Sequence, residues 1–223
     1  MKKEIQFPDP NQADNDGLVS VGGELSPEYL LAAYAQGIFP WFNEGEPILW
    51  WSPNPRMVLY PDRIKISRSL DQRIKSNKFQ LLVDEDFRRV IEKCSKIKRR
   101  NQSGTWITST MIEAYTQLHK LGFAHSVQVY HDEELAGGLY GISLGRVFFG
   151  ESMFFEIPDA SKVALAVLCK NLVKWKFHLV DVQQSTAHMR SMGAEDIPRQ
   201  QFLNELEQAL QYPTRKGKWN FDG

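Results

Sequence analysis

Three polar residues lie within or directly after predicted strands, and they are the first candidates for chemistry. Glu151 directly follows the apolar run VFFG, in the motif GESMF. Asp181 and Gln183 are two residues apart in the predicted strand HLVDVQQ, so their side chains share one face. A buried carboxylate and a buried amide both need hydrogen-bond partners, so a functional site competes here with ordinary structural pairing. For Glu151 the alternative is a glutamate at a strand end that faces water.

Several familiar kinds of catalytic motif are missing from the sequence. The chain has no P-loop and no Gly-x-Gly-x-x-Gly fingerprint, and its one Gly-x-Ser-x-Gly match, GISLG at residues 141–145, lies within a predicted meander and not at a strand-to-helix elbow. The five histidines show no spacing typical of zinc ligands: His119, His125, His131, His178 and His188. The polar groups on strand faces therefore favour the positioning of a reactive substrate over nucleophilic or metal catalysis. We expect no metal and no cofactor.

Aromatic residues are concentrated in one proline-rich segment, GIFPWFNEGEPILWWSPNPR, at residues 37–56. This segment holds three of the six tryptophans, Trp41, Trp50 and Trp51, together with four prolines. Proline at this density prevents a helix and disfavours a central strand, so the segment is predicted to be irregular and rigid.

The charge of the chain is balanced overall but uneven along its length. The formal net charge of the 223 residues is zero, which disfavours a protein that binds nucleic acid over its whole surface. Residues 63–100 carry 13 Lys and Arg against 5 Asp and Glu, so the rest of the chain is acidic. This run is either a solvated helix face or a footprint for a polyanion.

The composition indicates a protein of the reducing cytoplasm. No apolar run is long enough to span a bilayer, and the first residues lack the apolar core of a signal peptide. The two cysteines, Cys94 and Cys169, lie in stretches that look helical and do not form a metal motif. We expect a cytoplasmic protein with no membrane contact.

The pattern of elements predicts a mixed α/β (α+β) protein. Residues 27–36 form a predicted helix with Ser26 as its N-cap and Pro27 at its first position. Residues 124–155 alternate with period two and predict an antiparallel meander, which a helix capped by Asp159 follows. A strand at 178–184 and a helix after residue 198 complete this order.

Other boundaries are predicted from capping residues and breaks in the pattern. Asp84 is the expected cap of one helix, and Thr110 with Glu113 has the spacing of a capping box for another. The tail from Pro213 is predicted to be loose. A division near residue 62 would give a small N-terminal domain, 1–62, and a larger domain, 63–223.

Taken together and in order, several motifs resemble a known family. FPWF, ILWWSPNPR, ISRS, GTWIT, GESMF, ASK and DVQ resemble the leucyl/phenylalanyl-tRNA–protein transferases of bacteria, over residues 17–210. The resemblance implies a small N-terminal domain beside a GNAT-like domain with a mixed, largely antiparallel sheet. It implies that Leu or Phe, and sometimes Met, passes from aminoacyl-tRNA to the N-terminal amine of proteins that begin with Arg or Lys, which marks them for N-end-rule degradation.

The resemblance also implies roles for individual residues. Asp181 and Gln183 match the proposed catalytic pair, and Glu151 matches the glutamate of GESMF in the pocket. Trp41 and Trp106 match tryptophans that hold the terminal adenosine, where each stacked base contributes about 1–3 kcal/mol. The remaining matches are a tyrosine near the adenosine and the lining of the aminoacyl pocket: Tyr115, Met153, Phe149, Leu139 and Leu168.

Contacts with the body of the tRNA are expected at three basic residues. Arg68 in ISRS matches a tRNA-contacting position of the family, whereas Arg73, Lys75 and the basic run 93–100 are inferred from charge alone. The implied partners are Leu-tRNA or Phe-tRNA and the acceptor proteins, with no DNA. We expect a monomer.

The implied reaction is physically reasonable without a strong base. An ester becomes an amide, and an α-amine with a pKa of about 7.7–8.0 is partly neutral at pH 7. Gln183 is too weak to be a base, but it can orient the amine, while Asp181 holds Gln183 or stabilises positive charge.

The sequence leaves three alternative functions to consider against the transferase. A noncatalytic RNA-binding module would bind tRNA without transfer, and an aminoacyl-tRNA-dependent ligase would use a non-protein acceptor. An acetyltransferase that uses acyl-CoA needs a pyrophosphate loop, which the stretch GISLGR does not provide.

Overall fold

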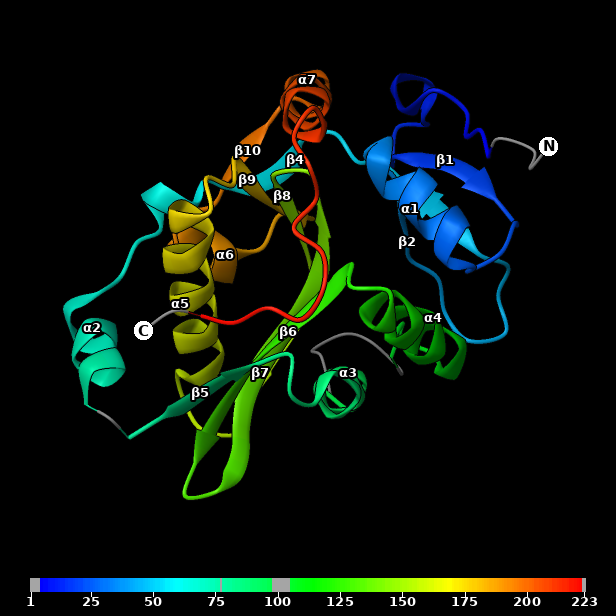
Figure 1. Ribbon diagram of the computed structural model, residues 1–223. Helices are drawn as coiled ribbons and strands as arrows, with labels where there is room; N and C mark the ends of the chain where they lie inside the picture. The colour runs from blue at the N-terminus through cyan, green and yellow to red at the C-terminus, as the bar shows by residue number, and fades with distance from the viewer. Residues whose placement is uncertain (1–4, 77, 98–104, 222–223) are drawn as a thin grey trace.

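The computed structural model of the protein describes residues 5–76, 78–97 and 105–221. Within these residues the strands form one sheet of three strands and one of seven, with helices on both faces of the larger sheet (Figure 1). The basic run predicted at 93–100 is described only to residue 97, so its last three residues lie outside this range.

The small sheet belongs to the N-terminal part of the chain. Its elements, in chain order, are η1 Pro10–Gln12, β1 Leu18–Val21, α1 Pro27–Ala35, β2 Phe39–Pro40 and β3 Leu49–Trp51. Its strands are antiparallel in the order β1-β3-β2.

The large sheet takes up the remainder of the chain. Its strands are β4 Arg56–Leu59, β5 Gln80–Val83, β6 Ala124–His131, β7 Glu134–Leu144, β8 Val147–Phe155, β9 Leu179–Gln183 and β10 Glu195–Ile197. The helical elements are η2 Pro61–Arg63, α2 Arg68–Lys75, α3 Phe87–Ser95, α4 Ser109–Lys120, α5 Ala160–Lys174, α6 Ala187–Ser191 and α7 Arg199–Leu210.

The order of the large sheet is β10-β4-β9-β8-β7-β6-β5. All neighbours are antiparallel except β8 and β9, which run parallel because α5 connects them. This arrangement confirms the predicted mixed α/β class with a largely antiparallel sheet. One core packs α5 against the sheet, and the other packs α1, α3, α4 and α7 against the opposite face.

The parallel pair separates part of the way along its length. The pairing of β8 with β9 ends at Phe149 and Asp181, and the residues that follow on each strand no longer hydrogen-bond across. Glu151 and Gln183 come two residues later on their strands. A space therefore opens between the strands at the level of these two residues.

Two bulges lie beside this opening. On β8, Gly150 and Ser152 pair with consecutive residues of β7, so Glu151 is the extra residue. On β9, Asp181 and Gln183 pair with consecutive residues of β4, so Val182 is the extra residue. Gln183 itself has φ +64°, a left-handed conformation that is uncommon for a residue with a side chain. Bulges of this kind redirect side chains next to functional sites.

Two predicted helix starts are wrong by two residues. The N-cap of α3 is Asp86, whose carboxylate accepts from the amide of Arg89, and Asp84 lies before the helix. The N-cap of α4 is Thr108, whose hydroxyl accepts from Met111, so the predicted capping box at Thr110 does not form. In both places the sequence offers more than one residue that can cap a helix within two positions, and tertiary packing decides which of them begins the helix.

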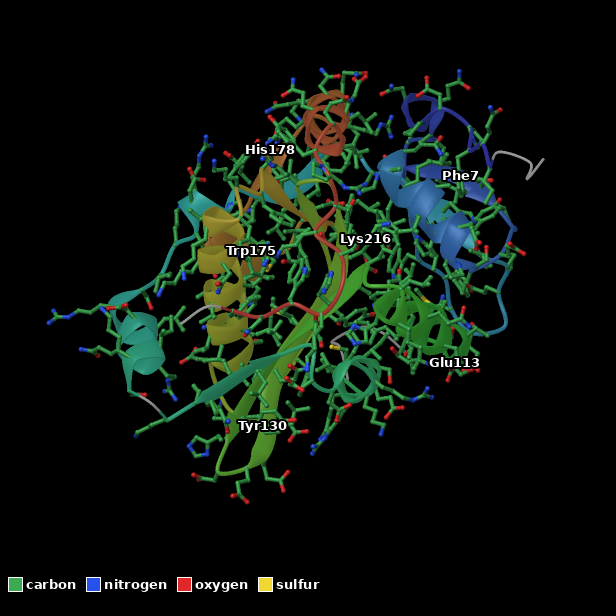
Figure 2. All side chains as sticks on the ribbon, in the orientation of Figure 1. Phe7, Glu113, Tyr130, Trp175, His178 and Lys216 are labelled. Carbon is green, nitrogen blue, oxygen red and sulfur yellow. The ribbon has the colours of Figure 1, made fainter. Side chains whose placement is uncertain are left out.

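The aromatic segment is not wholly irregular, contrary to the prediction. Residues 37–56 contain β2 and β3, and β3 is the central strand of the small sheet. Its Trp50 is fully buried and contacts Phe7 and Tyr29 (Figure 2 labels Phe7). The prolines are accommodated because these strands are only two or three residues long.

The C-terminal tail is ordered, which corrects the prediction of a loose end. Residues 211–221 run back across the molecule from α7 toward α5, shown in red in Figure 1. Trp219 is only 2% exposed.

The predicted division at residue 62 stays a prediction. The small sheet ends at Trp51, and β4 already pairs with β9 and β10 of the large sheet. Within the described residues no helix is both long and apolar enough to cross a membrane.

Candidate active site at the opening between two strands

A cavity of about 450 Å³ occupies the opening between β8 and β9. Seven of the predicted site residues line it: Trp41, Trp106, Leu139, Glu151, Met153, Leu168 and Gln183. Further lining comes from residues that the sequence did not single out, among them Phe148, Leu165, Val180, His188 and Met189. Apolar side chains dominate the lining, while Glu151 and Gln183 provide polar groups, a combination typical of small-ligand sites.

Glu151 is held by hydrogen bonds from three different elements. Its Oε1 accepts from the hydroxyl of Tyr34 on α1 at 2.6 Å and from Nε2 of Gln183 at 3.2 Å. Its Oε2 accepts from the hydroxyl of Tyr115 on α4 at 3.0 Å. The two tyrosine hydroxyls lie 2.5 Å apart, and both rings are fully buried. The carboxylate therefore has a fixed orientation at the wall of the cavity.

The surroundings of Glu151 bring its pKa close to neutrality. Burial raises the pKa to about 7, and the charge of Asp181 adds to the rise, while hydrogen bonds from Tyr34 and Tyr115 oppose it. Burial and the neighbouring Glu151 raise the pKa of Tyr34 and Tyr115 well above the usual value, so both phenols stay protonated donors. A carboxyl group of this kind can gain or lose a proton near pH 7.

Asp181 lies behind the cavity wall and does not line the cavity. It is fully buried and accepts a bidentate pair of hydrogen bonds from Arg56. Nε of Arg56 donates to Oδ1 at 2.8 Å, and Nη2 donates to Oδ2 at 2.6 Å. Its Oδ1 also accepts from the backbone amide of Gln183 at 3.0 Å. This bond helps to hold Gln183 in its left-handed conformation, so Asp181 positions the residue that faces the cavity.

Arg56 is a residue that the sequence analysis missed. Its guanidinium is fully buried, lies over the rings of Phe39 at 4.9 Å and Phe202 at 4.4 Å, and donates to the carbonyl of Gly37 at 3.2 Å. Tyr34 was missed as well. Neither residue had a signal in the sequence, because each reaches the site from a different element.

The other predicted site residues are placed away from the cavity surface. Tyr115 is buried and donates its hydroxyl hydrogen bond to Glu151. Phe149 is buried with its ring edge-on to that of Tyr34, with the ring centroids 5.1 Å apart. The basic residues predicted to contact tRNA lie on α2, which is next to α5 (Figure 1), and none of them lines the cavity: Arg68, Arg73 and Lys75.

Two of these basic side chains have acidic neighbours. Arg73 lies 3.4 Å from Asp159, and Lys75 lies 2.7 Å from Asp71 one helical turn away. All four side chains remain partly exposed to solvent. Solvent-exposed pairs of this kind are weak and can exchange partners.

Comparison with known proteins places this site in a family. Residues 58–207 match the family model of leucyl/phenylalanyl-tRNA protein transferase, and residues 23–54 match that of its N-terminal domain. A leucyl/phenylalanyl-tRNA–protein transferase of Legionella pneumophila (strain Corby) is 53% identical over 216 residues, which is 97% of this chain and 96% of that protein. One of Myxococcus xanthus (strain DK1622) is 54% identical over 213 residues, which is 96% of this chain and 91% of that protein.

Among solved structures, a GCN5-related N-acetyltransferase from Kribbella flavida aligns with a TM-score of 0.42 and 9% identity, covering 76% of this chain and 60% of that one. The sequence matches, in contrast, extend over nearly the whole chain and include the residues around the cavity. The chain belongs to the leucyl/phenylalanyl-tRNA–protein transferase family.

Proposed function

We propose that this enzyme transfers Leu or Phe from aminoacyl-tRNA to the N-terminal amine of proteins that begin with Arg or Lys. Family membership supports an aminoacyltransferase, and the names of its relatives supply the tRNA donor and the protein acceptor. The preference for Arg or Lys, a lesser use of Met, and N-end-rule degradation of the product are parts of the proposal. We place the reaction in the cytoplasm, with the enzyme as a monomer.

The observation that carries the proposal is the division of the cavity into two kinds of surface. Trp41 and Trp106 offer aromatic faces on which a terminal adenine can stack. Leu139, Met153 and Leu168 provide an apolar lining suited to a Leu or Phe side chain. Glu151 and Gln183 lie along the same cavity and face the place where the ester would lie between these surfaces.

The reaction needs one proton to move. The acceptor nitrogen forms a bond with the ester carbonyl carbon, the bond from that carbon to the ribose oxygen breaks, and the proton of the amine ends on that oxygen. Glu151, with a pKa of about 7, is suited to take this proton and return it. Gln183 orients the reacting groups, and Asp181 and Arg56 hold Gln183 from behind. Proximity supplies a large part of the rate.

The test mixes the protein with tRNA that carries labelled Leu or Phe and with a peptide that begins with Arg. Mass spectrometry then looks for a peptide extended by one residue, and a peptide that begins with Ala is the control. Extension of the Arg peptide alone supports the reaction and its acceptor rule. Binding of tRNA without extension of either peptide would instead favour a binding module or a ligase with a non-protein acceptor.

A further inference from the structure

The C-terminal strap, residues 211–221, lies beyond the residues that match the family model, which end at 207. It is attached at several points to the large sheet and its turns. The guanidinium of Arg146 lies 3.4 Å from the centre of the Tyr212 ring, and the amide of Gly145 donates to the Thr214 hydroxyl at 2.9 Å. Farther along, the amide of Gly217 donates to the carbonyl of Gly122 at 3.1 Å. The strap is therefore a built part of the fold.

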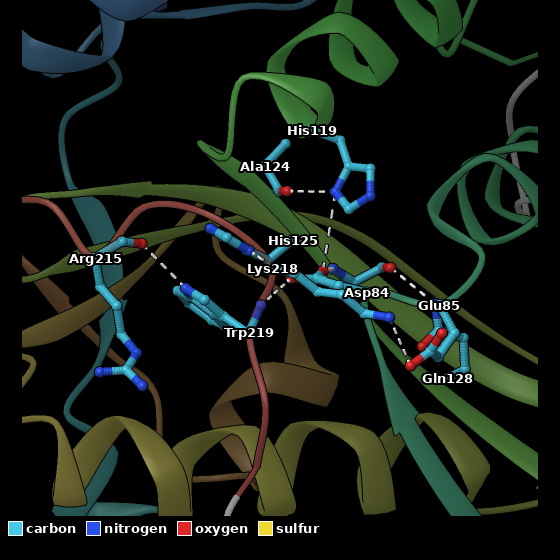
Figure 3. Close-up of polar contacts among 10 residues, drawn as sticks. Asp84, Glu85, His119, Ala124, His125, Gln128, Arg215, Lys218 and Trp219 are labelled. Atoms are coloured by element: carbon cyan, nitrogen blue, oxygen red, sulfur yellow. Dashed lines mark hydrogen bonds and ion pairs between the residues drawn. The ribbon is translucent and has the colours of Figure 1, made fainter.

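The last anchor of the strap is a buried carboxylate (Figure 3). Asp84 accepts from the backbone amide of Trp219 at 2.8 Å and from that of Ser126 at 2.8 Å, and it lies 2.8 Å from Nδ1 of His125. Asp84 is 5% exposed and adopts φ +56°. A carboxylate buried this deeply requires such partners, so the position of Trp219 is tied to the sheet.

The ring of Trp219 connects this anchor to the cavity. It stacks on His125, with centroids 3.7 Å apart and planes at 9°, and it packs edge-on against Trp175 at 4.9 Å. It also contacts Phe148 with centroids 5.9 Å apart. Phe148 is 1% exposed and is one of the residues that line the cavity. Trp219 thus lies directly behind a side chain of the cavity wall.

We propose that Trp219 is a positioning residue that sets the size of the aminoacyl cavity by holding the ring of Phe148. This inference rests on the proposed function, because it assigns the cavity to the Leu or Phe side chain. Interiors are close-packed, so a smaller residue at 219 leaves space into which Phe148 can move. The cavity then becomes longer and accepts the larger Phe side chain better relative to Leu.

The experiment uses Trp219→Phe and Trp219→Leu in the full chain. One tRNA body is charged with Leu or with Phe, so that only the amino acid differs, and kcat/KM is measured for each donor with an Arg-initiated peptide. We expect the ratio of kcat/KM for Phe to that for Leu to rise on the order of 10-fold in Trp219→Leu and less in Trp219→Phe. Assays are run well below the melting temperature of each variant.

Trp50→Phe and Trp50→Leu are the matched controls, because Trp50 is equally buried but packs in the N-terminal layer. A purely structural effect would lower both donors alike and leave the ratio unchanged, as we expect for the Trp50 variants. Combining Trp219→Phe with Phe148→Leu should give a change in the ratio that is not the sum of the two single changes, since residues in contact couple.

An unchanged ratio in both Trp219 variants, or strict additivity with Phe148→Leu, would overturn the inference. Failure of the wild-type protein to transfer either amino acid would instead overturn the proposed function. These two failures are distinguishable because the wild-type assay comes first.

Discussion

At the scale of single residues, the side chains of the ion pair Arg56–Asp181 are both fully buried. Replacing Arg56 with Leu would leave the Asp181 carboxylate without its partner in a region from which water is excluded. We expect the free energy of unfolding to fall by about 3–5 kcal/mol, measured by urea denaturation. Arg63→Leu is the control, because its pair with Glu195 is more than half exposed on both sides and should contribute less than about 1 kcal/mol. Equal losses in the two variants would contradict this assignment.

Glu151 gives a second prediction at this scale, through the dependence of rate on pH. Wild-type kcat/KM should fall as the pH drops below about 7, where Glu151 becomes protonated, in addition to the ionisation of the acceptor amine near 8. Glu151→Gln should lower the rate about 100-fold or more and remove the lower ionisation from the profile. Glu156→Gln, directly after the same strand and exposed, should keep both ionisations. A Glu151→Gln profile that still shows both ionisations would assign the lower one to another group.

Much of the site at this scale could be predicted from the sequence, but its supports could not. Glu151, Asp181 and Gln183 were identified from strand position and spacing, and the structure brings Glu151 and Gln183 within hydrogen-bond distance. Tyr34 and Arg56 remained hidden because their partners are more than a hundred residues away along the chain. A contact of that range depends on how the sheets pack, and no local pattern records it.

At the scale of elements, the bulge on β8 depends on glycines that let the strands approach. A Cβ at Gly141 would lie 2.2 Å from the carbonyl oxygen of Phe149 and 2.6 Å from the ring of Phe148. Its partner across the strands, Gly150, would meet only ordinary contacts at 3.6 Å and beyond. We expect Gly141→Ala to lower the free energy of unfolding by about 1–3 kcal/mol and Gly150→Ala by less than about 1 kcal/mol, measured by urea denaturation. The reverse order would show that β7 and β8 adjust differently from this account.

The elements themselves followed from periodicity and capping, and their exceptions have local causes. The meander, α5 and α7 appear where the pattern predicted them. The starts of α3 and α4 shifted because competing capping residues lie within two positions of each other. The short strands of the small sheet and the ordered strap were missed, since both depend on burial of tryptophans against distant parts of the chain.

At the scale of the whole molecule, ion pairs compensate part of the uneven charge of the sequence within the described residues. Of the basic residues between positions 63 and 100, Arg88 pairs with Glu92 and Glu113, and Lys93 pairs with Glu156, directly after β8. The pairs with Glu113 and Glu156 connect α3 to other parts of the chain. A count of charges by sequence window therefore overestimates the free positive surface, and tRNA contacts on α2 remain to be tested by substitution of Arg68.

The strap makes the stability of the whole molecule depend on pH through His125. Burial lowers the pKa of His125 below its ordinary 6.5, and His119 adds to this effect while Asp84 opposes it. The unfolded chain then binds a proton that the folded protein resists, so this stabilisation is present above about pH 6.5 and is lost as the pH falls. We expect the free energy of unfolding to decrease on acidification more steeply in the wild type than in His125→Gln, by up to about 1.4 kcal/mol per pH unit.

The measurement is urea denaturation at a series of pH values from about 7.5 to 5.5. Burial also lowers the pKa of His188, and it raises that of Glu151 to about 7, so both groups contribute slopes of their own. Those contributions are common to the wild type and His125→Gln, and the difference between the two curves isolates His125. His188→Gln is the control, because it leaves the strap and its anchor intact. Adding His125→Gln to this variant should change the pH dependence of the free energy of unfolding as much as it does in the wild type. Parallel curves for the wild type and His125→Gln would mean that protonation of His125 does not affect the stability of the folded protein, which would contradict this account.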